Sequence, residues 1–286
     1  MGDSVRSSVI VVTYQNPRYL DLVLAGLQRQ VTAADEVIIA DDGSDAATAV
    51  VVDRWRHHLP LRHVWHDDQG VRKAAIVNAA MAVAGGDLFA FLDGDTIPHC
   101  QWLADHLRLY DGASIACGRR VRLQERLSRR LCGGQVSLAQ FDSPFTRTMV
   151  GGYLRREVRR FPLAIRLPTT LRLLVASKQK GLMGCNFSGP ARVFEAVNGY
   201  DAAWDGAAHL CEDYDLELRL RTTGVSLRPA VHTAPVFHLF HRERPMTEQA
   251  AALRRARAGV DCRYATDGIV EAGQRLLAGT VRLDPG

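Results

Sequence analysis

The sequence lacks any apolar run approaching the roughly 18 uninterrupted residues that a membrane-spanning helix requires. It also has no internal repeat and no low-complexity segment. Its first residues enter a strand pattern almost at once, so no signal peptide is visible. These absences argue against an integral membrane protein and against a secreted precursor.

Paired cysteines are missing as well. The six cysteines are scattered along the chain and form no C-x-x-C pair. This scatter argues against a zinc site and a disulfide framework, and it fits a reducing cytoplasm.

Acidic residues are scarce in one part of the chain. Residues 119–180 hold fifteen Arg or Lys against three acids, Glu125, Asp142 and Glu157, which is a net charge of +12. Because the whole chain carries +5, the remainder carries about −7. A basic block inside a globular chain needs an acidic partner or surface, such as phosphate, anionic lipid or nucleic acid.

The first half of the chain alternates strand and helix patterns. With 286 residues and 47% hydrophobic content, the chain can bury a sizeable core, with or without an appended subdomain. We expect strands over 8–13, 36–40, 61–65, 88–92 and 113–117, and helices over 17–28, 46–56, 72–84 and 98–110. Such alternation predicts a mainly parallel sheet covered on both faces, with ligands at the carboxyl ends of its strands.

The second half is less regular. Segments 123–131 and 153–174 are helix-like and rich in Arg, and Pro162 and Pro168 interrupt the second of them. A regular pattern returns at Gly184, and a helix is expected from Glu212 to Arg221. The last forty residues indicate a surface helix and a tail.

The tripeptide Asp93-Gly94-Asp95 closes the apolar strand expected over 88–92. Two carboxylates one residue apart repel each other unless a positive group holds them, and a divalent cation with oxygen ligands does so. The alternative is an Asp-Gly turn with solvated acids. A second acidic pair, Asp41-Asp42, also follows an expected strand. Because both pairs fall at the carboxyl edge of the sheet, we interpret that edge as a ligand-binding site.

Six short motifs, in order along residues 7 to 245, resemble the family 2 glycosyltransferases of the GT-A fold. They are VIVVTY at 9–14, IIADDGS at 38–44, GVRKAAIVN at 70–78, DGD at 93–95, GCNFSG at 184–189 and EDYDL at 212–216. Each is weak singly, but six in order make a strong signal. The resemblance implies an α/β GT-A fold, with a Rossmann-like, mainly parallel sheet flanked by helices. It also implies inverting, metal-dependent transfer of a sugar from a UDP-sugar.

For the donor, the resemblance implies that Asp42, with Thr13 nearby, holds the base and ribose, since a carboxylate can accept the imide N–H of uracil. Arg72 or Lys73 would lie near base or phosphate; the alternative for both is an exposed helix start. The implied nucleotide-sugar-binding residues are Thr13, Tyr14, Asp42, Arg72, Lys73, Asn78, Asp93, Gly94 and Asp95.

The resemblance also implies a metal site. Asp93 would face ribose or metal, and Asp95 would coordinate Mn²⁺ or Mg²⁺ bridging the diphosphate, where a cation stabilises the leaving phosphate. Related enzymes often take a late histidine as a third ligand, and either His238 or His241 fits. The alternative for each histidine is a structural role.

For the acceptor, the resemblance makes Asp213 the general base, with Glu212 assisting in acceptor binding. Both begin a helix, whose dipole keeps a carboxylate ionised and able to take a proton. The alternative is an acidic cluster that only caps the helix. Trp204 could stack on a sugar ring or pack in the core, and Asn186 is the third residue expected to bind acceptor.

Two departures from the family pattern limit the prediction. The segment before EDYDL lacks the Trp-Gly-Gly run of the galactosyl and N-acetylgalactosaminyl branches, which leaves the donor sugar open. The chain also lacks the Gln-x-x-Arg-Trp motif and membrane helices of processive synthases. We therefore expect the addition of a single sugar.

Three other functions compete with this interpretation. A nucleotidyltransferase on a similar fold would generally place a Gly-rich loop after the first strand, where this chain has TYQNP at 13–17. A non-catalytic, basic nucleic-acid-binding protein would leave the strand-end acids without purpose, so we expect no nucleic acid partner. A carbohydrate-binding relative without turnover is the third.

The basic block at 119–180 mixes Arg pairs with Leu, Phe and Val, which suits a surface that meets anionic lipid. The alternative is a solvated charged face. A glycan or lipid-linked glycan acceptor of bacterial surface polysaccharide synthesis would supply membrane and phosphate, at the inner face of the membrane. We accordingly divide the chain into a donor-binding half (1–118), an acceptor-binding half (119–245) and a C-terminal helical tail (246–286).

Overall fold

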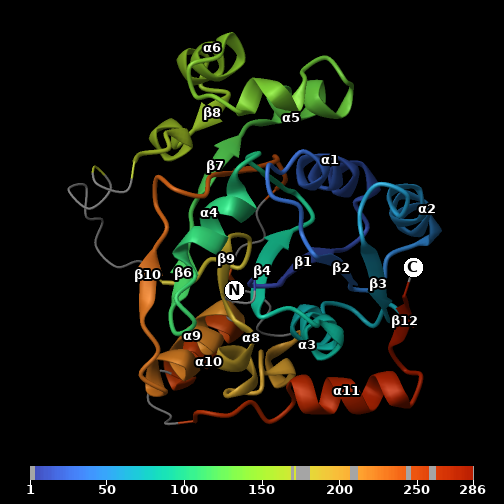
Figure 1. The fold of residues 1–286 in the computed structure, drawn as a ribbon. Coiled ribbons are helices and arrows are strands. Elements are labelled where there is room, and N and C mark those ends of the chain that lie inside the picture. Colours follow the sequence, from blue (N-terminus) through green and yellow to red (C-terminus); the bar gives the residue numbers. More distant parts are fainter. Residues whose placement is uncertain are drawn as a thin grey trace.

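The computed structural model describes residues 4–168, 171, 181–206, 212–242, 246–257 and 262–285. Within these residues an eight-stranded sheet runs through the molecule (Figure 1). Its strands are β1 (Ser7–Thr13), β2 (Glu36–Asp41), β3 (Leu61–Trp65), β4 (Leu88–Asp93), β6 (Ile115–Cys117), β9 (Phe187–Pro190), β10 (Leu227–Pro229) and β12 (Arg282–Asp284). They lie in the order β10-β6-β9-β4-β1-β2-β3-β12.

The centre of this sheet is parallel, as expected. Strands β3, β2, β1 and β4 pair in parallel, while β9 and β12 run antiparallel to their neighbours. The central strands are buried on both faces and are therefore continuous apolar runs, such as Val9–Val11, rather than alternating patterns.

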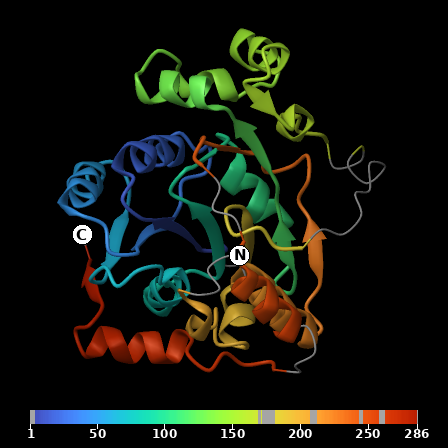
Figure 2. The same ribbon diagram turned by 180° about the vertical axis from the view of Figure 1, so that it is seen from behind.

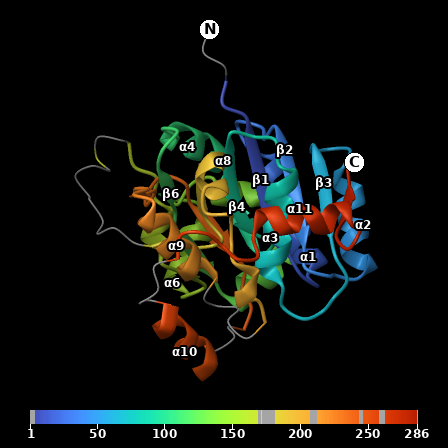
Figure 3. The ribbon, with the colours of Figure 1, turned by 90° about the horizontal axis from the view of Figure 1, so that it is seen from below.

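Helices cover both faces of the sheet (Figures 1 and 2). One face carries α1 (Pro17–Gln28), α2 (Ala46–Trp55) and α4 (Trp102–Leu109), and the other carries α3 (Lys73–Val83), α8 (Ala191–Glu195), α9 (Glu212–Thr222) and α11 (Ile269–Leu277). Helix α10 (Glu248–Arg257) touches α9 and projects from the body (Figure 3). Among the described residues, no helix combines the length and apolar character needed to cross a bilayer.

A second, four-stranded sheet has the order β5-β11-β7-β8. Its strands are β5 (Thr96–Pro98), β11 (Val236–His238), β7 (Arg120–Leu123) and β8 (Val158–Arg159). Helices α5 (Glu125–Cys132) and α6 (Arg147–Leu154) and the short 3₁₀ helices η1 (Leu138–Phe141) and η2 (Phe161–Ala164) lie around β7 and β8, beyond α1 (Figure 1). This sheet joins the segment after Asp93 to distant parts of the chain.

Two expected segments differ from the structure. Residues 96–98 form β5 before α4 begins at Trp102, because Pro98 pairs with Val236. In the segment expected to be helical over 153–174, α6 ends at Leu154 and β8 follows, and Arg156 and Arg160 adopt positive φ, which ends a helix. Residues 169–170 and 172–174 of that segment lie outside the described residues.

The C-terminal part is more than a helical tail. Helix α11 packs against α3, and β12 pairs with β3 at the edge of the main sheet. The short 3₁₀ helix η3 (Ala202–Trp204) leads toward α9.

Candidate active site

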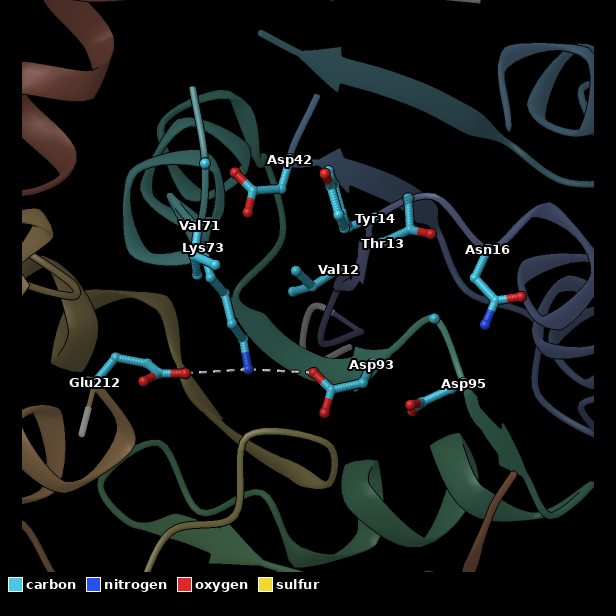
Figure 4. A pocket seen from close by; sticks show the side chains of 12 residues that line it. Val12, Thr13, Tyr14, Asn16, Asp42, Val71, Lys73, Asp93, Asp95 and Glu212 are labelled. Carbon is cyan, nitrogen blue, oxygen red and sulfur yellow. Dashed lines mark ion pairs between the residues drawn. The ribbon is translucent and has the colours of Figure 1, made fainter. Parts of the chain in front are cut away.

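A cavity of about 380 Å³ opens at the carboxyl ends of β1 and β4 (Figure 4). It lies where parallel α/β sheets bind ligands. Eight residues expected to belong to the site line it: Thr13, Tyr14, Asp42, Lys73, Asp93, Gly94, Asp95 and Glu212. The structure thus brings the strand-end acids and the start of the acidic helix to one hollow.

Asp42 is held in a fixed orientation. Its Oδ1 lies 2.8 Å from Nε2 of His66, and its Oδ2 accepts a hydrogen bond of 3.0 Å from the backbone N–H of Arg72. Because a carboxylate oxygen can accept two hydrogen bonds, Oδ2 keeps acceptor capacity toward the cavity. Asp41 is turned away, with Ser44 N and His63 Nε2 as its partners.

Beside β1, the backbone at Gly94 approaches Val12 and Thr13 closely, and the hydroxyl of Thr13 has no partner in the described structure. A Cβ added to Gly94 would lie 2.9 Å from the backbone oxygen of Val12 and 3.0 Å from Oγ1 of Thr13, so only glycine fits there. Oγ1 of Thr13 is buried without a hydrogen-bond partner in the described structure. Buried polar groups normally have partners, so this hydroxyl indicates a ligand contact.

Lys73 bridges the two sides of the cavity. Its Nζ lies 3.3 Å from Oδ1 of Asp93 and 3.6 Å from Oε1 of Glu212 (Figure 4). Burial alone would lower the pKa of Lys73, but the surrounding carboxylates, led by Asp93, raise it well above its usual value. The cavity therefore holds a permanent positive charge that could meet a phosphate or balance the acids.

Glu212 and Asp213 have different surroundings at the start of α9. Burial and the nearby charge of Asp213 outweigh Lys73 and raise the pKa of Glu212 to about 7. Oε2 of Glu212 is buried without a partner in the described structure. Asp213 instead accepts hydrogen bonds from the backbone N–H of Gly184 (2.8 Å) and from the hydroxyl of Tyr200 (3.1 Å). Of the two carboxylates, Glu212 lines the cavity, whereas Asp213 directly follows it at the start of α9.

Asp95, His238 and His241 form a group whose ligand atoms all lie within 4.8 Å of one another. Nε2 of His241 and of His238 lie 3.2 Å and 3.6 Å from Oδ2 of Asp95, respectively. Burial, then Arg120 and His241, lowers the pKa of His238 to about 3, so its imidazole is neutral and can offer a lone pair. Burial and the charge of Asp93 raise the pKa of Asp95 to about 6. One carboxylate and two imidazoles fit a divalent metal. Asp93 lies outside this group and pairs with Lys73.

Two expected site residues are structural instead. Asn78 is fully buried; it donates to the backbone oxygen of Tyr200 and accepts from its N–H, which ties α3 to that segment. Asn186 is also fully buried, and its amide donates to the backbone oxygens of Arg119 and Ala234. Its side-chain oxygen accepts a hydrogen bond from the Nε1–H of Trp102. Both side chains are fully buried and absent from the lining of the cavity, so neither is placed to contact a ligand there.

Arg72 and Trp204 also lie outside the cavity. The guanidinium of Arg72 donates to Gln69, so Lys73 is the basic residue of this pair that reaches the cavity. Trp204 is half-buried, with Cζ of Arg257 5.7 Å from its ring centroid. Neither side chain is placed to contact a ligand in the cavity.

Some lining residues were absent from the expected set: Val12, Asn16, Gly70 and Val71. Two of them, Gly70 and Val71, belong to the GVRKAAIVN motif, which was therefore the available signal. Asn16 lies three residues after the end of β1 and caps α1, so its position near the carboxyl edge of the sheet could also be predicted from the sequence. Tyr200, which holds Asp213, carries no local signal because it reaches the site through tertiary contact.

Comparison with known proteins gives a family. The family model described as glycosyl transferase family 2 matches residues 8–156, more than half of the chain. The chain is 34% identical over 111 residues to validoxylamine A glucosyltransferase of Streptomyces hygroscopicus subsp. jinggangensis, covering 38% of this chain and 26% of that protein. It is 33% identical over 108 residues to chondroitin synthase of Pasteurella multocida, covering 37% and 11%. The matched part spans about a quarter or less of these relatives.

Solved structures resemble the whole fold. S. aureus TarS gives a TM-score of 0.59 at 16% identity, over 96% of this chain and 42% of that one. The mannosyltransferase PcManGT from Pyrobaculum calidifontis, in complex with GDP-Man and Mn²⁺, gives 0.54 at 18% identity, over 89% and 62%. These likenesses establish the expected GT-A fold. On its sequence, the chain belongs to glycosyl transferase family 2.

Proposed function

We propose that the chain transfers a single sugar from a UDP-sugar to a hydroxyl of a glycan or lipid-linked glycan acceptor, with inversion. The observation that carries this proposal is the cavity at the ends of β1 and β4. It combines an orphaned hydroxyl on Thr13 and acceptor capacity on Asp42 at one end with the Asp95–histidine group at the other. A nucleotide diphosphate needs these two kinds of partner at opposite ends.

The choice of UDP follows from the base end of the cavity. Asp42 accepts hydrogen bonds but donates none when ionised, and the uracil imide N–H is a suitable donor. Among the structural neighbours, TarS is described in complex with UDP and PcManGT with GDP-Man. Both nucleotides therefore belong in the test.

Asp95, His238 and His241 would hold the divalent cation. When bound, the cation would stabilise the negative charge that develops on the leaving diphosphate. Two imidazoles beside one carboxylate favour Mn²⁺ over Mg²⁺, which takes mostly oxygen ligands. Lys73 would neutralise Asp93 and approach the same phosphates.

The displacement itself requires a proton acceptor. The acceptor hydroxyl oxygen attacks the anomeric carbon, the bond from that carbon to the phosphate oxygen breaks, and UDP leaves from the opposite face. Asp213, oriented by Gly184 and Tyr200, takes the hydroxyl proton. Glu212 assists in placing the acceptor, because it lines the cavity.

The acceptor side is assigned to the second half of the chain. Residues 1–118 supply most of the donor cavity, and residues 119–245 would supply the acceptor side. Of the tail at 246–286, α11 packs on α3 and β12 pairs with β3. The basic block at 119–180 would attach the protein to an anionic membrane on its cytoplasmic face, where lipid-linked acceptors of surface polysaccharides are found. Exposed apolar side chains beside its arginines support this placement: Phe145, Val150, Tyr153 and Leu154.

Calorimetric titration of UDP and of GDP, with and without Mn²⁺, tests the proposal. We expect UDP to bind in the presence of Mn²⁺ and to lose at least tenfold in affinity when EDTA removes the metal or when Asp95 is replaced (Asp95→Ala). Asp53→Ala, an exposed acid on α2, is the matched control and should bind as the wild type does.

Other results would point elsewhere. Binding of neither nucleotide under any metal would contradict the donor site, and a gel shift that disappears with salt would then favour the nucleic-acid-binding alternative. Turnover of a nucleoside triphosphate with release of pyrophosphate would favour the nucleotidyltransferase. Tight UDP binding without release of UDP from any UDP-sugar would indicate the non-catalytic relative.

A further inference from the structure

A second cavity, of about 450 Å³, adjoins the Asp95–histidine group, because His238 and His241 line it. Its walls are the exposed face of β7 and β8 and the segment that follows β11. The lining residues are Arg122, Leu123, Gln124, Arg159, His238, Leu239, Phe240, His241 and Arg242. We call it the arginine cavity; no carboxylate belongs to its described lining.

Strand register aligns its charges with the Asp95–histidine group. In the small sheet His238 pairs with Thr96 on one side and with Arg122 on the other, and Arg122 pairs with Arg159. Paired residues point to the same face, and neighbouring strands lie about 4.8 Å apart. The backbone of Arg122, one strand away, therefore lies about 5 Å from that of His238, and the backbone of Arg159, two strands away, lies about 10 Å from it. Val121, the neighbour of Arg122 in β7, faces the core instead.

These arginines differ from those of a comparable cavity elsewhere. A cavity of the same volume, about 450 Å³, is lined by Arg108, Arg166 and Arg228, but each of these is paired with a carboxylate. Arg108 and Arg166 contact Asp105 at 2.6 and 2.7 Å, and Arg228 contacts Asp111 at 2.8 Å. In the arginine cavity, by contrast, no carboxylate of the described residues forms an ion pair with Arg159 or Arg242. The charges of Arg159 and Arg242 are therefore available to an anion from outside.

The two cavities share no lining residue, yet they meet at one point. Asp95 lines the donor cavity, His238 and His241 line the arginine cavity, and these three side chains are in contact. A molecule in each cavity would therefore approach the other at the Asp95–histidine group. Such an arrangement suits two substrates that meet at this group.

We infer that the arginine cavity binds a phosphoryl group of the acceptor, with Arg159 and Arg242 as its partners. This inference rests on the proposed glycosyl transfer and names the acceptor class: a sugar or polyol that carries a phosphate. Arg159 follows α6 closely in the chain, so a phosphate attached to lipid would enter from the side assigned to the membrane. Arginine suits this task because its planar fork binds phosphate oxygens in pairs.

Calorimetry with α-glucose 1-phosphate tests the inference, on protein whose donor cavity is already saturated with UDP and Mn²⁺. We expect saturable binding of one equivalent, no binding of uncharged glucose, and at least a tenfold weaker Kd in R159Q/R242Q. Both arginines are exposed, so this variant should fold, which an unchanged Tm would verify. The matched control is R108Q/R228Q, from the paired cavity, and it should bind the probe as the wild type does.

The other outcomes are equally informative. No saturable binding to the wild type, or equal Kd values for the wild type and R159Q/R242Q, would overturn the inference. If R159Q/R242Q weakened UDP binding instead, the arginines would serve the donor diphosphate and the assignment to the acceptor would be wrong. If UDP failed to bind the wild type, the proposed function would fail, while the same titration without UDP would still decide whether the cavity binds phosphate.

Discussion

Glu212 and Asp213 are neighbours in sequence but differ in what holds them. Hydrogen bonds from Gly184 and Tyr200 fix Asp213, whereas Glu212 faces the donor cavity beside Lys73. We expect Asp213→Asn to lower kcat on the order of 10²- to 10⁴-fold, as loss of a general base does. UDP affinity should be unchanged. The measurement is UDP release from the donor, with water as acceptor until a better one is found.

Glu212→Gln is the matched comparison, since it removes the charge of the carboxylate next to Asp213 and keeps the shape of the side chain. It should raise KM for the acceptor more than it lowers kcat. A larger loss of kcat in Glu212→Gln than in Asp213→Asn would move the role of base to Glu212.

His106 makes the folded state sensitive to acid. It is fully buried between Ser188 and Asn186, and burial lowers its pKa to about 4. Because the folded pKa lies below the unfolded value of about 6.5, the neutral ring stabilises the fold above pH 6.5. That contribution is lost as the pH falls from about 6.5 to 4, and it amounts to about 3 kcal/mol.

Urea denaturation of the wild type and of His106→Gln at several pH values isolates the contribution of His106 to the free energy of unfolding. We expect the difference in unfolding free energy between the two proteins to be largest at pH 8 and to shrink toward pH 4. A difference that stays constant over this range would contradict the assignment. All other titrating groups cancel in the comparison.

At the residue scale, the sequence predicts the residues that line the cavity better than the residues that hold them in place. The strand-end acids, Lys73 and Glu212 are readable, because strand ends and helix starts converge at one edge of such a sheet. Asn78 and Asn186 were misjudged because a motif does not say whether an amide faces a ligand or the core. Their partners, such as Tyr200 and Trp102, come from distant segments.

Among the elements, α3 depends on a cap from far along the chain. Both carboxylate oxygens of Asp205 accept backbone N–H groups at the start of α3, from Ala74 (2.9 Å) and Ala75 (3.0 Å). We expect Asp205→Ala to cost about 1 kcal/mol of unfolding free energy, as loss of a helix cap does. UDP affinity should also fall several-fold, because Lys73 begins the same helix.

Asp45→Ala provides the control. Asp45 caps α2 through the N–H of Ala47, so its loss should destabilise the protein similarly in urea denaturation and leave UDP affinity unchanged. Equal effects of the two variants on UDP binding would show that the position of α3 does not matter to the donor site.

Elements formed by local pattern were predictable, and those formed by distant pairing were not. Helix α1 and strand β3 have the bounds that the sequence predicts, because apolar periodicity and the Asn16 cap act within the segment. Strands β5, β8 and β12 are two or three residues long and exist only through pairing with remote partners. No local pattern of three residues can specify such a partner.

For the whole molecule, we propose that the apolar patch around α6 attaches the protein to an anionic membrane. Phe145 and Leu154 are each 74% exposed, and the exposed Arg147, Arg155 and Arg156 lie close to them in the chain. We expect the protein to sediment with anionic vesicles and not with neutral ones, and F145S/L154S to lower this binding at least tenfold. Burying each such side chain in the interface contributes roughly 1.5–3 kcal/mol.

Leu277→Ser is the matched control, because Leu277 is 91% exposed on α11, away from the basic block. It should bind vesicles as the wild type does. Equal recovery with neutral and anionic vesicles, or an effect of Leu277→Ser as large as that of the α6 variant, would argue for a solvated charged face.

Strand β12 also bears on how copies of the molecule meet in solution. Without it, β3 would present a row of unpaired backbone N–H and C=O groups, which can recruit a strand of another chain. By pairing with β3, residues 282–284 replace that row with a strand of three residues that carries Arg282 and Asp284. Arg282 lies over the ring of Trp65, and Asp284 pairs with Arg56 of the neighbouring helix segment. A short, charged strand at this edge of the sheet thus disfavours pairing with a strand of another molecule.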